Sequence, residues 1–506
     1  MELSQKQKGV LLSYINLIAK NLVTFIYTPI LLRMLGQSEY GLYQMANSVI
    51  SSLTLLNMGF SSAYTRFYAQ ARNGQDSEKK ISELNGLYLI LFLFISVLSV
   101  ILGAILIFNI HGLFHQSLDV NEINTLKYLM VLMILNIAIT FPSSVFDSFI
   151  IAHEQFGFQR SRQLFQTVFT PIFTLPLLFL GFKSISVVLT QTVIVILFLY
   201  LNMSFSFKKL QMKISFKNMN FSVLKAILNF SFFIFLNQVI DQINWSLPNF
   251  LLGIYSGTKE VAIFSIATQI NNIFITLSTA LSGVYVPEIN NIVSTTNDNK
   301  KLTEIMTSVG KMQMLILSYI LAGFVLVGRE FIIVWAGAGY TKSYAVALLL
   351  ILPFIVTLVQ NTGYEIIRAK NMHQFRAVVE LIFSVISIGI SIFFIKKFGV
   401  LGATVGSALT MVIVSWFIMN WFYNNRANLD MSYFWKKILV VVPPALIALV
   451  FCEILKIKFP VNGIISFITY IIIYTSIYMI LLYKISITSS EKRKLFSFLN
   501  NLRRKN

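Results

Sequence analysis

One lysine stands near the middle of the first long apolar stretch of the sequence, where a membrane would tolerate a charge least. Lys20 lies within residues 10–33, and Asn16 and Thr24 stand four residues to either side of it, so that a helix would carry all three on one face. In a hydrocarbon core about 30 Å thick, Lys20 would lie about 15 Å from either end. A lysine that faces lipid there costs about 2.5–3.5 kcal/mol. We therefore expect Lys20 to face a polar cavity, and a buried structural salt bridge is the alternative.

Four carboxylates in other apolar stretches are candidates for binding a proton or a cation. A shift of 221 residues carries Lys20 onto Asp241, which places a charge at the same depth in the second half of the chain. Carboxylates inside a membrane mark ion pathways and proton relays, or they pair with a cation. As a hypothesis, Lys20 and Asp241 pair with each other when no substrate is bound. The coupling candidates are Asp147, Asp241, Glu365 and Glu380.

Amide side chains recur at helical spacing in both halves of the chain. Such stripes either line a polar cavity or form hydrogen bonds between helices, and matching stripes in both halves favour the cavity. No motif for a metal ion or a catalytic nucleophile surrounds the four histidines, so neither catalytic residues nor a cofactor are expected. The candidates for substrate binding are Lys20, Asn16, Asn21, Thr24, Asn136, Asn237, Asn244, Gln269, Asn272, Gln360, Asn361 and Arg368.

The elements that must position these residues are membrane helices. The chain has 506 residues, of which 56% are hydrophobic and 12% charged. A mean hydropathy of +0.74 lies outside the range of soluble domains. We expect an all-α polytopic membrane protein with about fourteen transmembrane helices. The apolar runs are 10–33, 41–65, 85–109, 126–152, 161–181, 184–205, 226–253, 260–286, 306–328, 343–367, 375–395, 401–423, 438–455 and 463–483.

The net charge of +20 is concentrated in the predicted loops and ends. With the N-terminus in the cytoplasm, most of the 40 Lys and Arg fall in cytoplasmic loops and in the C-terminal tail. This asymmetry is the positive-inside pattern, and it predicts that both termini are cytoplasmic. It also accounts for the charge without nucleic acid as a partner.

The chain reads as two halves that repeat one pattern. The shift of 221 superposes Gly36 on Gly257 and Glu39 on Glu260, and six predicted helices per half imply a repeat axis along the membrane normal. The binding site is expected between the two lobes. The predicted domains are an N-lobe (1–207), a basic cytoplasmic linker (208–225), a C-lobe (226–425), and two further helices with a basic tail (426–506).

Two segments at equivalent places in the halves carry a family resemblance. The first, residues 12–50, reads LSYINLIAKNLVTFIYTPILLRMLGQSEYGLYQMANSVI, and its most specific part is LRMLGQSEYGLYQ. The second, residues 241–272, reads DQINWSLPNFLLGIYSGTKEVAIFSIATQINN. Both resemble the bacterial polysaccharide flippases, the Wzx-type, polysaccharide transport branch of the multidrug/oligosaccharidyl-lipid/polysaccharide exporter superfamily. The resemblance extends over roughly residues 8–425.

The resemblance implies a MATE-like fold of two six-helix lobes that opens alternately to each side. It implies transport of an undecaprenyl-(pyro)phosphate-linked oligosaccharide across the bacterial cytoplasmic membrane for capsule, O-antigen or teichoic acid synthesis. Lys20 matches a cation that holds the substrate phosphate in related flippases, and Arg66 and Arg160 are weaker matches because both fall near cytoplasmic mouths. A phosphate suits a desolvated cation, and sugar hydroxyls suit Asn, Gln, Ser and Thr.

Two other functions remain open on the sequence alone. A cation-coupled multidrug or small-molecule antiporter of the same superfamily would use the carboxylates. A membrane-embedded glycan polymerase or glycosyltransferase would need a sizeable extramembrane loop, and the longest predicted outer connection, about residues 110–123, is short. The expected partners are the lipid-linked oligosaccharide and the bilayer, with H⁺ or Na⁺ as a coupling ion and a polysaccharide polymerase as further candidates. The protein is expected to be a monomer.

Overall fold

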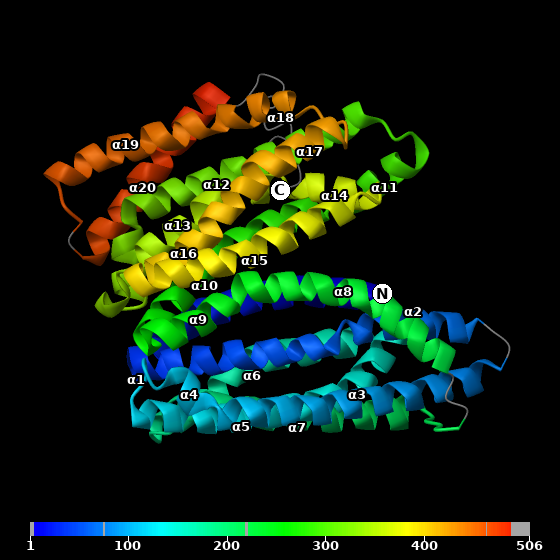
Figure 1. Ribbon diagram of the computed structural model, residues 1–506. Helices are drawn as coiled ribbons and strands as arrows, with labels where there is room; N and C mark the ends of the chain where they lie inside the picture. The colour runs from blue at the N-terminus through cyan, green and yellow to red at the C-terminus, as the bar shows by residue number, and fades with distance from the viewer. Residues whose placement is uncertain (1–4, 74–75, 218–220, 462, 487–506) are drawn as a thin grey trace, which may run out of the picture. The chain divides into compact units, whose positions relative to one another are not determined.

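The computed structural model describes residues 5–73, 76–217, 221–461 and 463–486, and all regular elements among them are helices (Figure 1). The chain forms two compact units. Unit 1 comprises Met1–Ser265 and Ile392–Ala403, and unit 2 comprises Ile266–Ser391 and Thr404–Asn506. The predicted lobe boundaries, 1–207 and 226–425, differ from these units and stay a prediction.

Unit 1 is built around α1, which packs against α5, α6, α7 and α9. Helices α3, α5 and α7 run beside one another in Figure 1, where α5 lies against both of the others. The complete elements of unit 1 are α1 (Gln5–Leu53), η1 (Thr54–Asn57), α2 (Phe60–Arg72), α3 (Ser77–Phe108), α4 (Ile110–Phe114), α5 (Val120–Ala152), α6 (Phe156–Phe179), α7 (Lys183–Ser204), η2 (Phe205–Lys209), α8 (Phe221–Trp245) and α9 (Leu247–Ser256).

Unit 2 is built around α12, which packs against α13, α18, α19 and α20. Three helices, α10, α15 and α16, cross the boundary between the units. The remaining elements are α10 (Thr258–Gly283), α11 (Val286–Thr295), α12 (Asn299–Trp335), η3 (Ala338–Tyr340), α13 (Ser343–Val359), α14 (Asn361–Ala369), α15 (His373–Phe398), α16 (Val400–Met411), η4 (Val412–Ile418), α17 (Met419–Asn425), α18 (Met431–Ile438), η5 (Leu439–Val441), α19 (Val442–Lys458), α20 (Ile464–Leu481) and η6 (Leu482–Ser486).

The described residues hold 11 helices long and apolar enough to cross a membrane, or up to 12 if the bent pair α13 and α14 counts as one span. The predicted number of about fourteen therefore stays a prediction. The runs 10–33 and 41–65 merge into one continuous stretch, because α1 passes through its bend at Gly36. Many side chains on the outside of the long helices are apolar, as a bilayer requires; Phe108, Ile457 and Ile465 are the most exposed of them.

The run 41–65 is not the single helix that the sequence suggested. The second arm of α1 ends at Leu53, the short η1 follows, and α2 begins at Phe60. Met58 and Gly59 between them have φ angles of 45° and 71°. Hydropathy does not register this break, because the residues on both sides are apolar.

The internal repeat is visible in the backbone. Gly36 has φ 74° and ψ 175°, and Gly257 has φ 83° and ψ −178°. This region of conformational space is open essentially only to glycine. Two glycines that the shift of 221 superposes therefore make the same sharp bend, one inside α1 and the other between α9 and α10.

The two repeat-equivalent glutamates, Glu39 and Glu260, also have the same structural role, because each accepts a hydrogen bond at the start of another helix. Glu39 accepts a hydrogen bond of 2.5 Å from the hydroxyl of Ser184, in the first turn of α7. Glu260 accepts a hydrogen bond of 2.9 Å from the backbone N–H of Val400, the first residue of α16. Each carboxylate thus meets the positive end of a helix dipole. The sequence match of Glu39 with Glu260 reflects a shared structural role.

The last two long helices are tied to α12. The hydroxyls of Tyr474 and Tyr478 on α20 donate to the backbone carbonyls of Tyr319 and Leu315, each at 2.9 Å. Cys452 of α19 is buried in the same cluster. These two helices therefore cover one side of α12.

Candidate functional site

Lys20 lies in the first arm of α1, and its side chain is exposed. Within the described part of the chain, its ammonium has neither a hydrogen-bond partner nor a carboxylate within ion-pair distance. The hypothesised pair between Lys20 and Asp241 is therefore not formed in this structure. The charge of Lys20 is available to an anion.

Asn16, one turn before Lys20, is held by α6. Its side-chain amide donates to Gln163 at 3.3 Å, and its carbonyl oxygen accepts from the hydroxyl of Thr167 at 3.2 Å. Gln163 also accepts from the guanidinium of Arg160 at 2.8 Å. These bonds form a polar strip on α1 and α6 close to the exposed ammonium of Lys20.

The two other candidates on α1 do not join this strip in any recorded hydrogen bond. Asn21 is exposed, and its amide donates to the carbonyl of Leu17 in its own helix at 3.0 Å. Thr24 is half-buried. We therefore place Asn16 and Lys20, rather than Asn21, at the centre of the candidate site.

Asp147 on α5 forms an ion pair with Arg162 on α6, at 2.5 Å. Arg162 also donates to the side-chain carbonyl of Asn202 on α7 and lies over the ring of Phe198, 5.1 Å from its centroid. The side chain of Arg162 is only 12% exposed and that of Asp147 is 30% exposed. Breaking a buried ion pair leaves an uncompensated charge, so this cluster holds three helices of unit 1 together.

The acidic candidates of unit 2 are paired as well. Glu365 lies 3.7 Å from Arg368 on α14, and Glu380 lies 2.6 Å from Arg376 on α15. Arg376 also stacks over the ring of Tyr364 at 4.1 Å. Three of the four coupling candidates are thus bound to an arginine.

The amide candidates Gln360 and Asn361 stand where α13 meets α14. Gln360 is buried and donates to Asn420 on α17 at 3.1 Å. Asn361 donates to Ser282 on α10 at 2.7 Å. In unit 1, the residues that lie 217 and 218 positions before Gln360 and Asn420 are Ser143 and Asn202, and the amide of Asn202 likewise donates to Ser143 at 3.5 Å. These amides therefore connect helices, which is the alternative reading of the stripes.

The remaining candidates are spread over several helices. Arg66 on α2 is exposed and lies over the ring of Phe230 on α8, 4.6 Å from its centroid. The side-chain oxygen of Asn136 on α5 is buried and has no hydrogen-bond partner among the described residues. The polar residues of α8 and α10 are exposed in the case of Asn237, Asp241 and Asn272, and half-buried in the case of Asn244 and Gln269.

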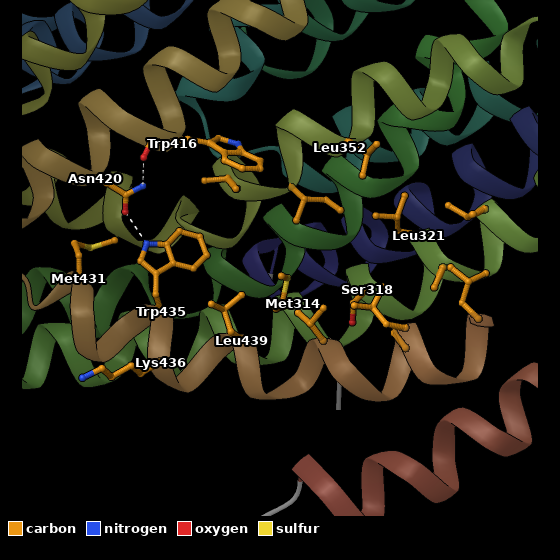
Figure 2. A pocket seen from close by; sticks show the side chains of 18 of the residues that line it. Met314, Ser318, Leu321, Leu352, Trp416, Asn420, Met431, Trp435, Lys436 and Leu439 are labelled. Atoms are coloured by element: carbon orange, nitrogen blue, oxygen red, sulfur yellow. Dashed lines mark hydrogen bonds between the residues drawn. The ribbon is translucent and has the colours of Figure 1, made fainter. Parts of the chain in front are cut away.

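A groove of about 910 Å³ lies within unit 2, between α12, α13 and η4 on one side and α18 and α19 on the other. Most of its lining is apolar. Figure 2 shows that the polar residues gather at one end, where Asn420 accepts from the indole of Trp435 at 2.7 Å and donates to the carbonyl of Trp416 at 2.8 Å. Lys436 lines the same end. The shape and the lining suit an apolar chain with a polar head.

The structure offers little to a metal ion. The described residues contain no group of three or more His, Cys, Asp or Glu side chains that could hold one. The rings of His111 and His115 stack with their centroids 6.0 Å apart. His153 bonds to the carbonyl of Phe149 and to the hydroxyl of Tyr68 at 2.9 and 3.0 Å.

Comparison with known families decides the affiliation of the chain. Residues 7–293, more than half of the sequence, match the family described as polysaccharide biosynthesis protein. The chain belongs to this family. The match includes both segments that carry the resemblance and α1 from residue 7 onward, which includes Lys20.

Several known proteins are similar to this polysaccharide biosynthesis protein. The probable flippase AglR of Haloferax volcanii is 28% identical over 174 residues, which are 33% of this chain and 36% of the relative. The match thus spans about a third of that protein. A structure of the lipid II flippase MurJ in an inward closed conformation has a TM-score of 0.71 at 16% identity, covering 93% of this chain and 97% of MurJ. A multidrug resistance MATE family transporter of the MOP superfamily, in its inward-facing conformation, has a TM-score of 0.64 at 13% identity, covering 83% and 96%.

These likenesses establish that the polysaccharide biosynthesis protein has the fold shared by MurJ and the MATE transporters. Within that fold, the sequence reasoning missed Gln163 and Thr167 on α6. Arg160, Gln163 and Thr167 follow one another at three- and four-residue spacing, which would have placed them on one helical face. Arg162 carried no such signal, because its partners Asp147 and Asn202 are on other helices.

Proposed function

We propose that this protein is a flippase that moves an undecaprenyl-(pyro)phosphate-linked oligosaccharide across the bacterial cytoplasmic membrane for the synthesis of a cell-surface polysaccharide. The observation that carries the proposal is the exposed, unpaired Lys20 beside a polar strip in the first membrane helix. Membership of the polysaccharide biosynthesis protein family supports it, as do the names of AglR and MurJ, both flippases.

Lys20 would hold the phosphate of the substrate. An ammonium without a carboxylate partner, deep in a membrane span, gains most from a charged ligand, because a low dielectric strengthens the attraction. The amides and hydroxyls of Asn16, Gln163 and Thr167 would meet sugar hydroxyls. Asn136, with its unsatisfied buried oxygen, is a further candidate for a sugar contact.

The groove of unit 2 would hold part of the polyprenyl chain. From Lys436 to Leu449 its wall runs for about 20 Å at 1.5 Å per residue, enough for several isoprene units. Beyond Lys436, the residues of η5 and α19 that line the groove are all apolar, so burial of an apolar chain against them is favourable. An apolar tail that travels within the membrane needs such a surface.

Alternating access requires a mouth that can close. At the end of unit 1 that holds Gly36, Glu122 of α5 accepts hydrogen bonds from Ser38 of α1 and from Thr258 of α10, the latter at 3.0 Å. This cluster joins helices of the first repeat to a helix of the second. We propose that it closes the outer mouth and that it separates when the transporter opens outward.

The remaining details of the proposal follow from the charge pattern. The positive-inside rule places both termini in the cytoplasm, and it puts the Gly36 end at the outer face. Among the candidate coupling residues, Asp241 is the one that the shift of 221 residues superposes on Lys20. H⁺ or Na⁺ would act there, with a polysaccharide polymerase as the downstream partner of a monomeric flippase.

Reconstitution tests the proposal against a drug transporter of the same fold. Purified protein is placed in liposomes with a fluorescent polyprenyl-diphosphate oligosaccharide, and a membrane-impermeant quencher reports the lipid in the outer leaflet. We expect protein-dependent exchange that Lys20→Ala slows at least tenfold. Exchange at the rate of empty liposomes, together with cation-driven export of a lipophilic cationic dye, would contradict the proposal and favour an antiporter.

A further inference from the structure

A second polar pocket lies at one end of unit 2, where α11, α14 and α17 end and α12 begins. Its volume is about 390 Å³, which is within the range of small-molecule sites. Two cations, Lys370 and Arg426, line it together with four amides, and none of its lining residues is acidic. The amides are Asn297, Asn299, Asn371 and Asn428. We call it the Lys370 pocket.

Lys370 is half-buried in this pocket. Its ammonium donates to the side-chain oxygen of Asn299 at 2.5 Å and to the carbonyl of Ala427 at 3.0 Å. Both partners are neutral, and no carboxylate of the described chain forms an ion pair with it. Burial lowers the pKa of Lys370, because the charge is only partly compensated. Since an ammonium has three N–H donors, one remains for a ligand.

The other polar groups of the pocket are also uncommitted. Arg426 is exposed, and its guanidinium forms no hydrogen bond or ion pair with a described residue. The same is true of the side-chain amides of Asn297, Asn371 and Asn428. Each of these three asparagines stands in a loop with a φ angle between 46° and 57°. The pocket therefore gathers a lysine with one donor left over, together with an arginine and three amides whose side-chain donors have no partner among the described residues.

The first repeat shows that the fold does not need this arrangement. A shift of 217 residues places His153 on Lys370 and Glu154 on Asn371, and the φ angles of the second pair agree, 58° and 57°. His153 instead forms hydrogen bonds through its two ring nitrogens to the carbonyl of Phe149 and to the hydroxyl of Tyr68. The cationic, amide-lined pocket is thus a feature of the second repeat alone.

We propose that the Lys370 pocket binds a phosphate group, either a phospholipid headgroup of the adjoining leaflet or free phosphate. A phosphate accepts several charge-assisted hydrogen bonds, which a guanidinium, an ammonium and amide N–H groups supply together. All three loops that form the pocket are cytoplasmic under the charge pattern, so the ligand would come from the cytoplasm or the inner leaflet. This site does not depend on the transported substrate, since Lys20 belongs to unit 1.

Thermal unfolding of the purified full-length protein in detergent tests the proposal. Inorganic phosphate is titrated against sodium chloride at equal ionic strength, and dioctanoylphosphatidic acid is titrated against dioctanoylphosphatidylcholine. We expect stabilisation of the wild type by at least one of the two phosphate probes. A response to inorganic phosphate identifies free phosphate as a sufficient ligand, and a response to the phosphatidic acid alone identifies the headgroup.

Matched variants show whether the pocket is responsible. We expect Lys370→Met and Arg426→Ala each to weaken the apparent affinity at least about tenfold. Lys301→Ala, which removes an exposed lysine near the same end of α12 but outside the pocket, should leave it unchanged. If Lys370→Met fails to fold, Arg426→Ala carries the test, because its side chain has no partner in the described structure. No stabilisation of the wild type, or an equal loss in Lys301→Ala, would overturn the proposal.

Discussion

Replacing Gly36 by alanine should destabilise the protein by about 1–2 kcal/mol. The φ and ψ angles of 74° and 175° lie in a region that costs a residue with a Cβ roughly 1–3 kcal/mol. Alanine also lowers the conformational entropy of the unfolded chain, which offsets about 0.4–1 kcal/mol of this loss of stability. A Cβ at Gly36 would meet no atom within 4 Å, so the strain of the backbone is the whole effect.

The repeat-equivalent Gly257 adds a clash to the same strain. A Cβ there would lie 2.9 Å from the carbonyl oxygen of Ser117, and overpacking of this kind costs about 1–3 kcal/mol more. Gly257→Ala should therefore cost roughly 2–5 kcal/mol. Gly112→Ala is the control, because Gly112 is in a helix and has open space around it. This variant should be more stable than the wild type by about 0.4–1 kcal/mol.

Thermal unfolding in detergent, followed by tryptophan fluorescence, orders the three variants. The expected order of melting temperatures is Gly112→Ala at or above wild type, then Gly36→Ala, then Gly257→Ala. Equal melting temperatures for Gly36→Ala and Gly112→Ala would refute the reasoning, because the bend of α1 would then not be the glycine-specific one. Gly257→Ala melting above Gly36→Ala would refute the contact with Ser117.

Three further results are expected. Ser38→Cys with Thr258→Cys, whose native oxygens lie 3.3 Å apart, should form a disulfide that stops transport until a reductant is added, whereas each single variant transports normally; transport by the fully cross-linked protein would contradict the proposed mouth. Leu446→Trp, which fills the groove of unit 2, should slow transport at least several-fold, and Ile447→Trp, equally exposed but outside the groove, should not; equal effects would remove the groove from the mechanism. Burial lowers the pKa of His153 below its usual value of about 6.5. The unfolded chain therefore binds more protons than the folded protein around that pH, and the protein should lose stability as the pH falls through about 6.5. If the melting temperature of His153→Gln shows the same loss, another group is responsible.

Much of the fold could be predicted from the sequence, because the length and the hydropathy of the apolar runs indicate membrane helices. The repeat was readable for a second reason. Gly36 and Gly257 occupy a conformation that no other residue adopts easily, and Glu39 and Glu260 each meet a helix N-terminus. Residues with such specific demands stay recognisable after the rest of the sequence has diverged.

The partners of the polar residues were harder to predict. Asp147 and Glu380 looked alike as carboxylates in apolar stretches, yet one pairs with an arginine on the next helix and the other with an arginine four residues before it in its own helix. Only the four-residue spacing of Arg376 and Glu380 predicts a pair from the sequence, because residues four apart are neighbours on one helix. Pairing across helices depends on how the helices rotate and pack, which hydropathy does not encode.

The groove of unit 2 could not be foreseen for a related reason. The segments that form α19 and α20 have few polar residues, and apolar side chains carry no sign of whether they will face lipid or another helix. In the structure, Tyr474 and Tyr478 fasten α20 to α12 through their hydroxyls. The groove is what remains between these added helices and the repeat.

The most direct test of the central claim is complementation of a bacterial strain that lacks its polysaccharide flippase. Wild type, Lys20→Ala, Lys20→Arg and the control Leu22→Ala, an exposed neighbour on α1, are expressed at matched membrane levels, and surface glycan and accumulated lipid-linked precursor are measured. The account predicts that Lys20→Ala accumulates precursor and that Lys20→Arg restores export, because a cation at this position holds the phosphate. Full export by Lys20→Ala would contradict it.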